Sequence, residues 1–173
     1  MLFNSLAFAV FLAIVLPLYF SLRHRYQNIM LLAASYVFYG WWEWRFLSLL
    51  AISTIVDYTV GLRLSKTHRP AARKALLLTS VCVNLGLLSS FKYFNFFVDS
   101  AGALLTQIGF APHLPVLRVV LPVGISFYTF QTMAYTISVY RGHHQPTRNL
   151  VSFALYVAYF PQLVAGPIER AEH

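Results

Sequence analysis

The sequence predicts an all-α fold, that of a polytopic helical membrane protein, from three observations. Of the 173 residues, 58% are hydrophobic and 10% are charged, whereas soluble domains have roughly 45–50% apolar and about 25% charged residues. Uncharged runs recur along the whole chain. These runs lack the alternating polarity, in segments of about ten residues, of a membrane barrel. The composition excludes a disordered chain, a coiled coil and an ordinary soluble enzyme.

Six runs are apolar enough to be transmembrane helices, which need about 20 mostly apolar residues. They are residues 1–22, 28–42, 46–62, 75–91, 119–140 and 150–168. The first run is expected to be a retained anchor, because Arg23 and Arg25 follow its apolar core, whereas the charges of a signal peptide precede it. No linker or low-complexity tract separates the runs. We therefore expect residues 1–173 to form one membrane domain without a separable soluble domain.

Basic residues gather in alternate connectors and predict the orientation in the membrane. The connectors after the first, third and fifth runs hold nine of the thirteen basic residues: Arg23, Arg25, Arg63, Lys66, Arg69, Arg73, Lys74, Arg141 and Arg148. The positive-inside rule places these connectors in the cytoplasm and the N-terminus on the other side. This topology accounts for the formal charge of +8, so no nucleic acid is expected as a partner.

Residues 93–111 are apolar but are interrupted by Asp99 and Gly102. If this segment crossed the bilayer, all later connectors would change sides, and Arg141 and Arg148 would then lie outside the cytoplasm. We therefore predict an interfacial or re-entrant element at residues 93–111.

The fifth run contains a polar stripe. Gly124, Tyr128, Gln131 and Tyr135 recur at steps of four, three and four residues, so they share one face of a helix. A glutamine amide in hydrocarbon needs hydrogen-bond partners, so this face is expected to meet another helix or a wet cavity. Both interpretations remain open: such residues commonly join neighbouring helices, and they also line passages.

The last run predicts a broken helix next to this stripe. Pro161 and Pro167 each lack a backbone donor, and Gly166 precedes the second of them. Irregular backbone at membrane depth is tolerated only where protein or water covers it. A site at the broken helix is one interpretation, and a simple proline kink or helix end near the interface is the other.

The remaining polar residues predict no catalytic group within the membrane. Asp57 is the only carboxylate well inside a run and is expected to form a shallow ion pair with Arg63 or another basic residue, with a proton relay as the alternative. The histidines all lie in connectors or at the end of the chain: His24, His68, His113, His143, His144 and His173. We therefore predict no metal site and no buried histidine base, and the single cysteine, Cys82, excludes an intramolecular disulfide.

Several motifs resemble one known family. The segments LPVGISFYTFQTMAYTISVYRG at 121–142 and FALYVAYFPQLVAGPIER at 153–170 closely resemble the membrane-bound O-acyltransferase (MBOAT) family, in its bacterial alginate O-acetyltransferase branch. The start of the chain, SYVFYGWWEW at 35–44 and KYFNFF at 92–97 resemble the same branch in the same order. The resemblance therefore covers essentially the whole chain.

The resemblance implies a multi-pass enzyme of the bacterial inner membrane, so the outer side that the basic connectors predict for the N-terminus is the periplasm. Such an enzyme takes acetyl groups from a cytoplasmic donor, expected to be acetyl-CoA, and passes them through a tunnel to an exported polysaccharide such as alginate. Periplasmic acetyltransferase proteins are the expected partners, and no bound cofactor is expected. The expected tunnel-lining residues are Gly124, Tyr128, Gln131, Tyr135, Gln162, Gly166 and Pro167.

The sequence departs from the family in one respect. The hallmark histidine of the family lies in a downstream apolar helix, and no residue here matches it, because His173 follows Glu-Arg-Ala-Glu. We therefore expect the N-terminal portion of an incomplete MBOAT bundle, inactive when alone, and assign the catalytic role to none of its residues. A non-catalytic membrane scaffold or remnant and a transporter or flippase remain alternatives.

Overall fold

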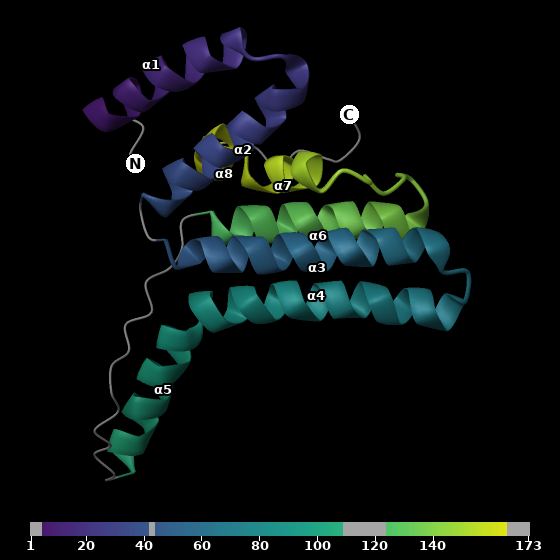
Figure 1. Cartoon of the computed structure of the whole chain (residues 1–173). Helices are drawn as coiled ribbons and strands as arrows, with labels where there is room; N and C mark the ends of the chain where they lie inside the picture. The colour runs from purple at the N-terminus through teal and green to yellow at the C-terminus, as the bar shows by residue number, and fades with distance from the viewer. Residues whose placement is uncertain (1–4, 42–43, 109–123, 166–173) are drawn as a thin grey trace.

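The computed structural model describes residues 5–41, 44–108 and 124–165 (Figure 1). These residues form helices and no strand, which confirms the predicted all-α class. The helices are α1 (Leu6–Ser21), α2 (His24–Gly40), α3 (Phe46–Lys66), α4 (Pro70–Lys92), α5 (Phe94–Gln107), α6 (Ile125–Arg141), α7 (Leu150–Ala158) and α8 (Phe160–Ala165). Each of the six predicted runs overlaps at least one of these helices.

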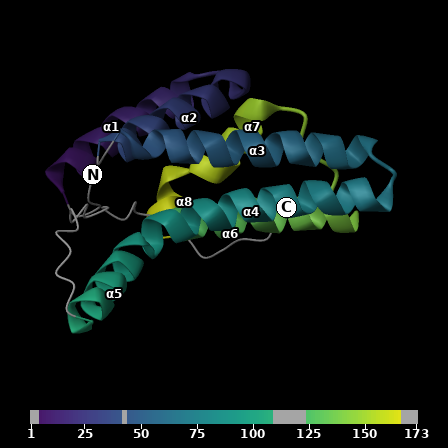
Figure 2. The same ribbon diagram turned by 90° about the horizontal axis from the view of Figure 1, so that it is seen from below.

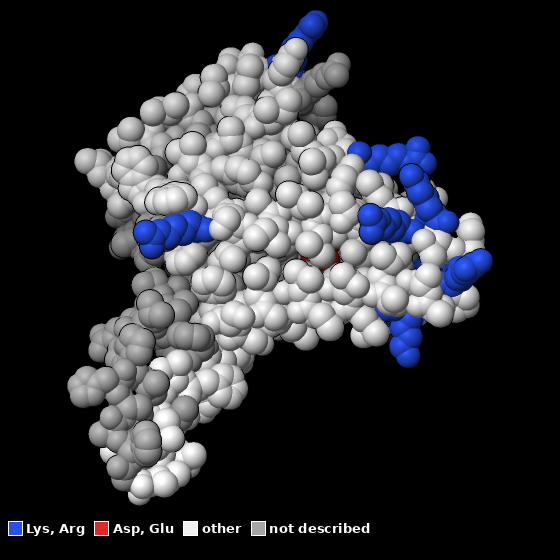
Figure 3. All heavy atoms as spheres, turned by 60° about the horizontal axis from the view of Figure 1, so that its bottom comes forward, with Lys and Arg blue, Asp and Glu red and all other residues white. Residues whose placement is uncertain are grey.

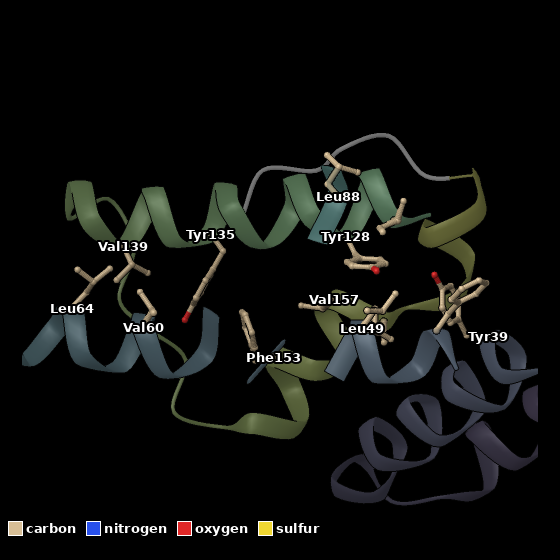
Figure 4. Close-up of a cluster of buried hydrophobic side chains, with 14 residues drawn as sticks. Tyr39, Leu49, Val60, Leu64, Leu88, Tyr128, Tyr135, Val139, Phe153 and Val157 are labelled. Carbon is tan, nitrogen blue, oxygen red and sulfur yellow. The ribbon is translucent and has the colours of Figure 1, made fainter. Parts of the chain in front are cut away.

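Three helices form the centre of the fold. Helices α3, α4 and α6 each contact the other two, and α7 packs against α2 and α3 on one side of them (Figures 1 and 2). The buried hydrophobic cluster lies between these elements (Figure 4) and includes Leu50 and Leu64 of α3, Tyr128 of α6 and Phe153 of α7. Helix α1 packs on α2 and leaves most of its apolar side chains exposed.

Two glycines fix the ends of α6. Gly124 precedes the helix with a φ of 78°, and Gly142 follows it with a φ of 76°. Side chains other than hydrogen disfavour this left-handed conformation. The glycines therefore stop the helix at both ends and turn the connector at residues 142–149 back toward the bundle.

The last predicted run is broken in two, as expected from its prolines. Helix α7 ends at Ala158, Tyr159 adopts a non-helical ψ of 111°, and α8 begins at Phe160. Pro161 is the second residue of α8, where a missing N–H costs nothing, whereas within a continuous helix it would clash with the carbonyl of Val157. Gly166 and Pro167, which were also expected at the break, lie outside the described residues.

Two of the described helices are long and apolar enough to cross a membrane, α3 with 21 residues and α4 with 23. At 1.5 Å per residue these lengths match a hydrocarbon layer of about 30 Å. Helix α1 and the α7–α8 segment are apolar but shorter. The apolar helices support a membrane protein, and the expected number of about six transmembrane helices stays a prediction.

Helix α5 occupies the segment predicted to be interfacial or re-entrant. It leaves the end of α4 at an angle and projects away from the bundle (Figures 1 and 2). Its 14 residues span about 21 Å, which is less than the hydrocarbon thickness. Phe96 and Phe97 are largely exposed on it. Its length and exposed aromatic side chains favour a position at the membrane surface, which stays a prediction.

Candidate functional site

A group of six buried polar side chains joins the three central helices, and we call it the polar centre. Each helix contributes two residues four positions apart, so that both lie on one face. The pairs are Ser53 and Asp57 of α3, Ser80 and Asn84 of α4, and Thr132 and Thr136 of α6. Each of the six side chains is completely inaccessible to solvent. Helix α6 has two further buried polar residues, Thr129 and Gln131, which do not belong to the polar centre.

The carboxylate of Asp57 accepts hydrogen bonds from both neighbouring helices. The hydroxyl of Ser80 donates to Oδ1, and the hydroxyl of Thr136 donates to the same oxygen at 3.2 Å. The amide of Asn84 donates to Oδ2 at 2.7 Å. The carboxylate therefore links α3 to α4 and to α6 at once.

The side chain of Asn84 forms the other half of the polar centre. Its Nδ2 donates to Asp57 and also to the Ser80 carbonyl at 3.0 Å. Its Oδ1 accepts from the Ser53 hydroxyl at 2.6 Å and from the Thr132 hydroxyl at 3.4 Å. All four hydrogen-bonding positions of this amide are thus used, as a buried amide requires.

The ion pair expected between Asp57 and Arg63 does not form. Every described partner of Asp57 is a neutral side chain, and Arg63 is exposed. The reason is the helical repeat: residues six apart lie about 240° apart around the axis, so the two side chains point to different faces. The expectation relied on closeness along the chain and neglected the direction of the side chains.

The polar stripe of α6 faces the hydrophobic cluster, about one quarter turn around the helix from Thr132 and Thr136. Tyr128, Gln131 and Tyr135 are all buried, whereas Gly124 serves as the N-cap of the helix. In Figure 4, Tyr128 and Tyr135 point from α6 toward the opposite wall of the cluster. The structure therefore brings these three predicted side chains to one buried surface.

Two of the stripe residues join neighbouring elements. Gln131 Nε2 donates to the Tyr156 carbonyl of α7 at 2.8 Å. The hydroxyl of Tyr135 accepts from the backbone N–H of Thr147 at 3.1 Å, and its ring lies 4.7 Å from that of Phe153. These contacts correspond to the first interpretation of the stripe, in which its polar groups join helices.

Two other buried donors have no hydrogen-bond partner among the described residues. They are the hydroxyl of Tyr128 and the side-chain Nε2 of Gln162 on α8. Such groups are uncommon in native proteins, and each one calls for an explanation. Both residues belong to the set expected to line a passage.

An apolar groove borders the broken helix. It has a volume of about 420 Å³ and lies between α1, α2 and α8, where Tyr159, Phe160 and Pro161 form its inner wall. The rings of Phe11, Phe38 and Phe160 pack against one another beside it, with centroids 5.4–5.8 Å apart. The side chains of Tyr128, Gln131 and Tyr135 do not line this groove.

Ser80 and Asn84 were not singled out from the sequence, although they complete the polar centre. A signal for them was available, because both are polar, lie four residues apart and interrupt the apolar run 75–91. The same spacing in three separate runs would have indicated three polar faces that meet.

Comparison with curated proteins reveals close relatives over nearly the whole chain. The chain is 46% identical over 172 residues to a protein of Azotobacter vinelandii named as a probable alginate O-acetylase, covering 98% of this chain and 34% of the relative. It is 47% identical over 174 residues to a protein of the same name from Pseudomonas putida, covering 98% of this chain and 35% of the relative.

A more distant relative carries a different substrate in its name. The chain is 30% identical over 198 residues to a peptidoglycan O-acetyltransferase of Helicobacter pylori, covering 97% of this chain and 37% of the relative. The chain spans about a third of the length of these relatives. No family model and no solved structure matches it.

Proposed function

We propose that this chain forms part of a membrane-bound O-acyltransferase of the alginate O-acetylase branch. The premise is its similarity to alginate O-acetylases over 98% of its length. The enzyme transfers acetyl groups across the inner membrane and O-acetylates an exported polysaccharide such as alginate. Acetyl-CoA is the proposed donor, and periplasmic acetyltransferase proteins are the proposed partners. The observation that supports this proposal is the sequence identity of 46–47% to the two probable alginate O-acetylases.

The reaction defines what the chain has to contribute. A polysaccharide hydroxyl attacks the donor thioester, the new C–O bond forms, the C–S bond breaks, and the hydroxyl proton ends on the leaving thiol through a base. Among the histidines whose side chains the structure describes, His68, His143 and His144 lie in connectors and none lies within a helix of the bundle. The role of these helices in the proposal is therefore to orient the substrate and exclude water.

The unpartnered donors support a positioning role. Tyr128 and Gln162 each hold a buried N–H or O–H group without an acceptor in the described part of the chain. A carbonyl oxygen of the acetyl group is an acceptor that would satisfy such a donor, which otherwise costs about 1–3 kcal/mol. Gln131 holds α7, which precedes α8, against α6. We therefore propose that Tyr128 and Gln162 contact the acyl group, and that Gln131 acts through α7 and α8 as a positioning residue.

Substitution in a full-length alginate O-acetylase tests this proposal. Leucine at the positions aligned with Gln131 and Gln162 is expected to reduce polysaccharide acetylation at least tenfold at an unchanged level of membrane-inserted protein, because the acyl group loses its orientation. The measurements are ester acetate per sugar and the amount of enzyme in the membrane fraction.

Valine at the position aligned with Thr79 is the matched control, because Thr79 is an exposed polar residue that bonds only to its own helix. That variant should acetylate normally. Normal acetylation by both glutamine variants would refute the assignment. A loss of enzyme amount with unchanged activity per molecule would show that the glutamines only join helices.

The proposed topology is tested by cysteine labelling of this chain in intact cells, in a Cys82→Ser background because Cys82 is exposed. Arg69 precedes α4, and Gln145 lines a pocket with residues from the end of α3 and the start of α4, so both lie at one end of the bundle. Arg69→Cys and Gln145→Cys are expected to react only after the inner membrane is made permeable. Asp99→Cys is expected to react from the periplasm, and labelling of Arg69→Cys in intact cells would reverse the proposed orientation.

A further inference from the structure

A basic pocket lies at the end of the bundle where α3 turns into α4 and α6 leads into α7. It has a volume of about 790 Å³, which is the size of a small-molecule site. Three basic side chains line it, Lys66, Arg73 and Arg148, together with the polar side chains of Ser65, His144 and Gln145. Figure 3 shows lysine and arginine side chains gathered at this end of the molecule.

Arg73 is built into the wall of the pocket. Its Nη1 donates to the Leu64 carbonyl at 2.6 Å, its Nη2 donates to the Tyr140 carbonyl at 2.6 Å, and the guanidinium lies 5.5 Å from the centre of the Tyr140 ring. The two carbonyls belong to the last turns of α3 and α6, where the helix dipoles are negative. Arg73 thus neutralises both helix ends and holds them together.

The connector at residues 142–149 forms the opposite wall and is attached to the core at two points. The backbone N–H of Thr147 donates to the hydroxyl of Tyr135 at 3.1 Å, and the hydroxyl of Tyr58 donates to the Arg148 carbonyl at 2.7 Å. Asn149 then caps α7 through hydrogen bonds to the N–H groups of Val151 and Ser152. The pocket therefore has two fixed walls.

Lys66 and Arg148 bring charge to this pocket that no acidic side chain in the described part of the chain neutralises. Both side chains are exposed. The acidic side chains that the structure describes are Asp57 and Asp99, and neither lines the pocket. Two cations that face one cavity without an anion raise each other's energy, and an anionic ligand removes this repulsion.

We propose that this pocket binds a phosphate group, carried by a soluble phosphate ester or by the headgroup of an anionic lipid. Arginine and lysine are the side chains that most often bind phosphate, with the guanidinium offering two parallel donors and the ammonium a point charge. The Gln145 amide and the Ser65 hydroxyl add neutral donors. This inference goes beyond the proposed acyl transfer and does not depend on it.

Membrane topology alone does not account for the arrangement. The positive-inside rule explains why basic residues are frequent in these connectors, but it does not require them to converge on a cavity. Arg63 lies in the last turn of α3, as Lys66 does, and Lys74 lies near the start of α4; both are exposed, yet they do not line the pocket. They therefore provide a control that removes the same charge from the same side of the molecule.

The test compares two double variants of the chain purified in neutral detergent, Lys66→Gln/Arg148→Gln and Arg63→Gln/Lys74→Gln. The soluble arm measures equilibrium binding of radiolabelled pyrophosphate at low ionic strength. The lipid arm measures, by native mass spectrometry, how much phosphatidylglycerol or phosphatidylcholine each protein retains from nanodiscs. Far-UV circular dichroism and a single elution peak establish that both variants are folded.

The unmodified chain is expected to bind the phosphate group saturably in at least one arm. The Lys66/Arg148 variant should lose at least tenfold in affinity or retention, and the Arg63/Lys74 variant less than threefold. Loss in the soluble arm shows that the pocket takes a soluble phosphate compound, and loss of phosphatidylglycerol alone identifies a lipid headgroup. Equal losses in the two variants, or no saturable binding in either arm, would overturn the proposal.

Discussion

Replacing Asp57 by alanine is expected to lower the midpoint of thermal unfolding of this chain in detergent by roughly 5–10 °C. The change removes the acceptor of three hydrogen bonds, from Ser80, Asn84 and Thr136. A buried donor without a partner costs about 1–3 kcal/mol. Some of the three donors are expected to find other partners in a membrane bundle, so the expected loss of stability is about 2–4 kcal/mol. The unfolding midpoint is measured by far-UV circular dichroism on heating.

Two further substitutions serve as controls for Asp57→Ala. Asp57→Asn keeps the shape and one oxygen, so its effect should be smaller than that of alanine. Asp99→Ala removes a carboxylate that is exposed on α5, and it should leave the midpoint unchanged. If Asp57→Ala unfolds at the same temperature as the unmodified chain, the polar centre does not hold α3, α4 and α6 together.

Replacing Gly61 by valine is the second change with a large expected effect, a destabilisation of about 1–3 kcal/mol by overpacking. A Cβ atom at this position would lie 3.1 Å from Cε1 of Tyr135 and 3.3 Å from its hydroxyl. The tyrosine cannot move freely, because its ring packs on Phe153 and its hydroxyl holds the N–H of Thr147. The same thermal measurement in detergent detects the loss.

Gly86 provides the matched control, because it also lies within a helix and a Cβ there would meet nothing within 4 Å. Gly86→Val changes the helix propensity equally but creates no clash. Combining Gly61→Val with Tyr135→Leu should recover part of the lost stability, as a double-mutant cycle would show. Equal losses at the two glycines would mean that the contact with Tyr135 is not the cause.

Local patterns predicted the elements of the fold well. Composition indicated the all-α class, the proline pattern indicated the break near Pro161, and the step of three and four residues indicated the buried face with Tyr128, Gln131 and Tyr135. The composition is a property of the whole chain, and the other two patterns depend on residues a few positions apart in the sequence. The positions of the helices and of the break could therefore be predicted from short stretches of sequence.

The partners of the site residues could not be predicted in this way. Asp57 is bonded to Ser80, 23 residues away, and to Thr136, 79 residues away. Such pairs depend on which helices are neighbours and on the rotation of each helix, and hydrophobic runs determine neither. Arg63 was a reasonable partner by distance along the chain, and the helical repeat directs it elsewhere.

The two left-handed glycines on either side of α6 have a consequence for length changes in related sequences. With Gly124 and Gly142 marking both ends, an inserted or deleted residue between them would rotate everything beyond it by about 100°. Tyr135 would then turn away from Phe153, and Thr136 would leave the carboxylate of Asp57. We therefore expect gains and losses of single residues in related sequences to fall in the connectors outside the two glycines.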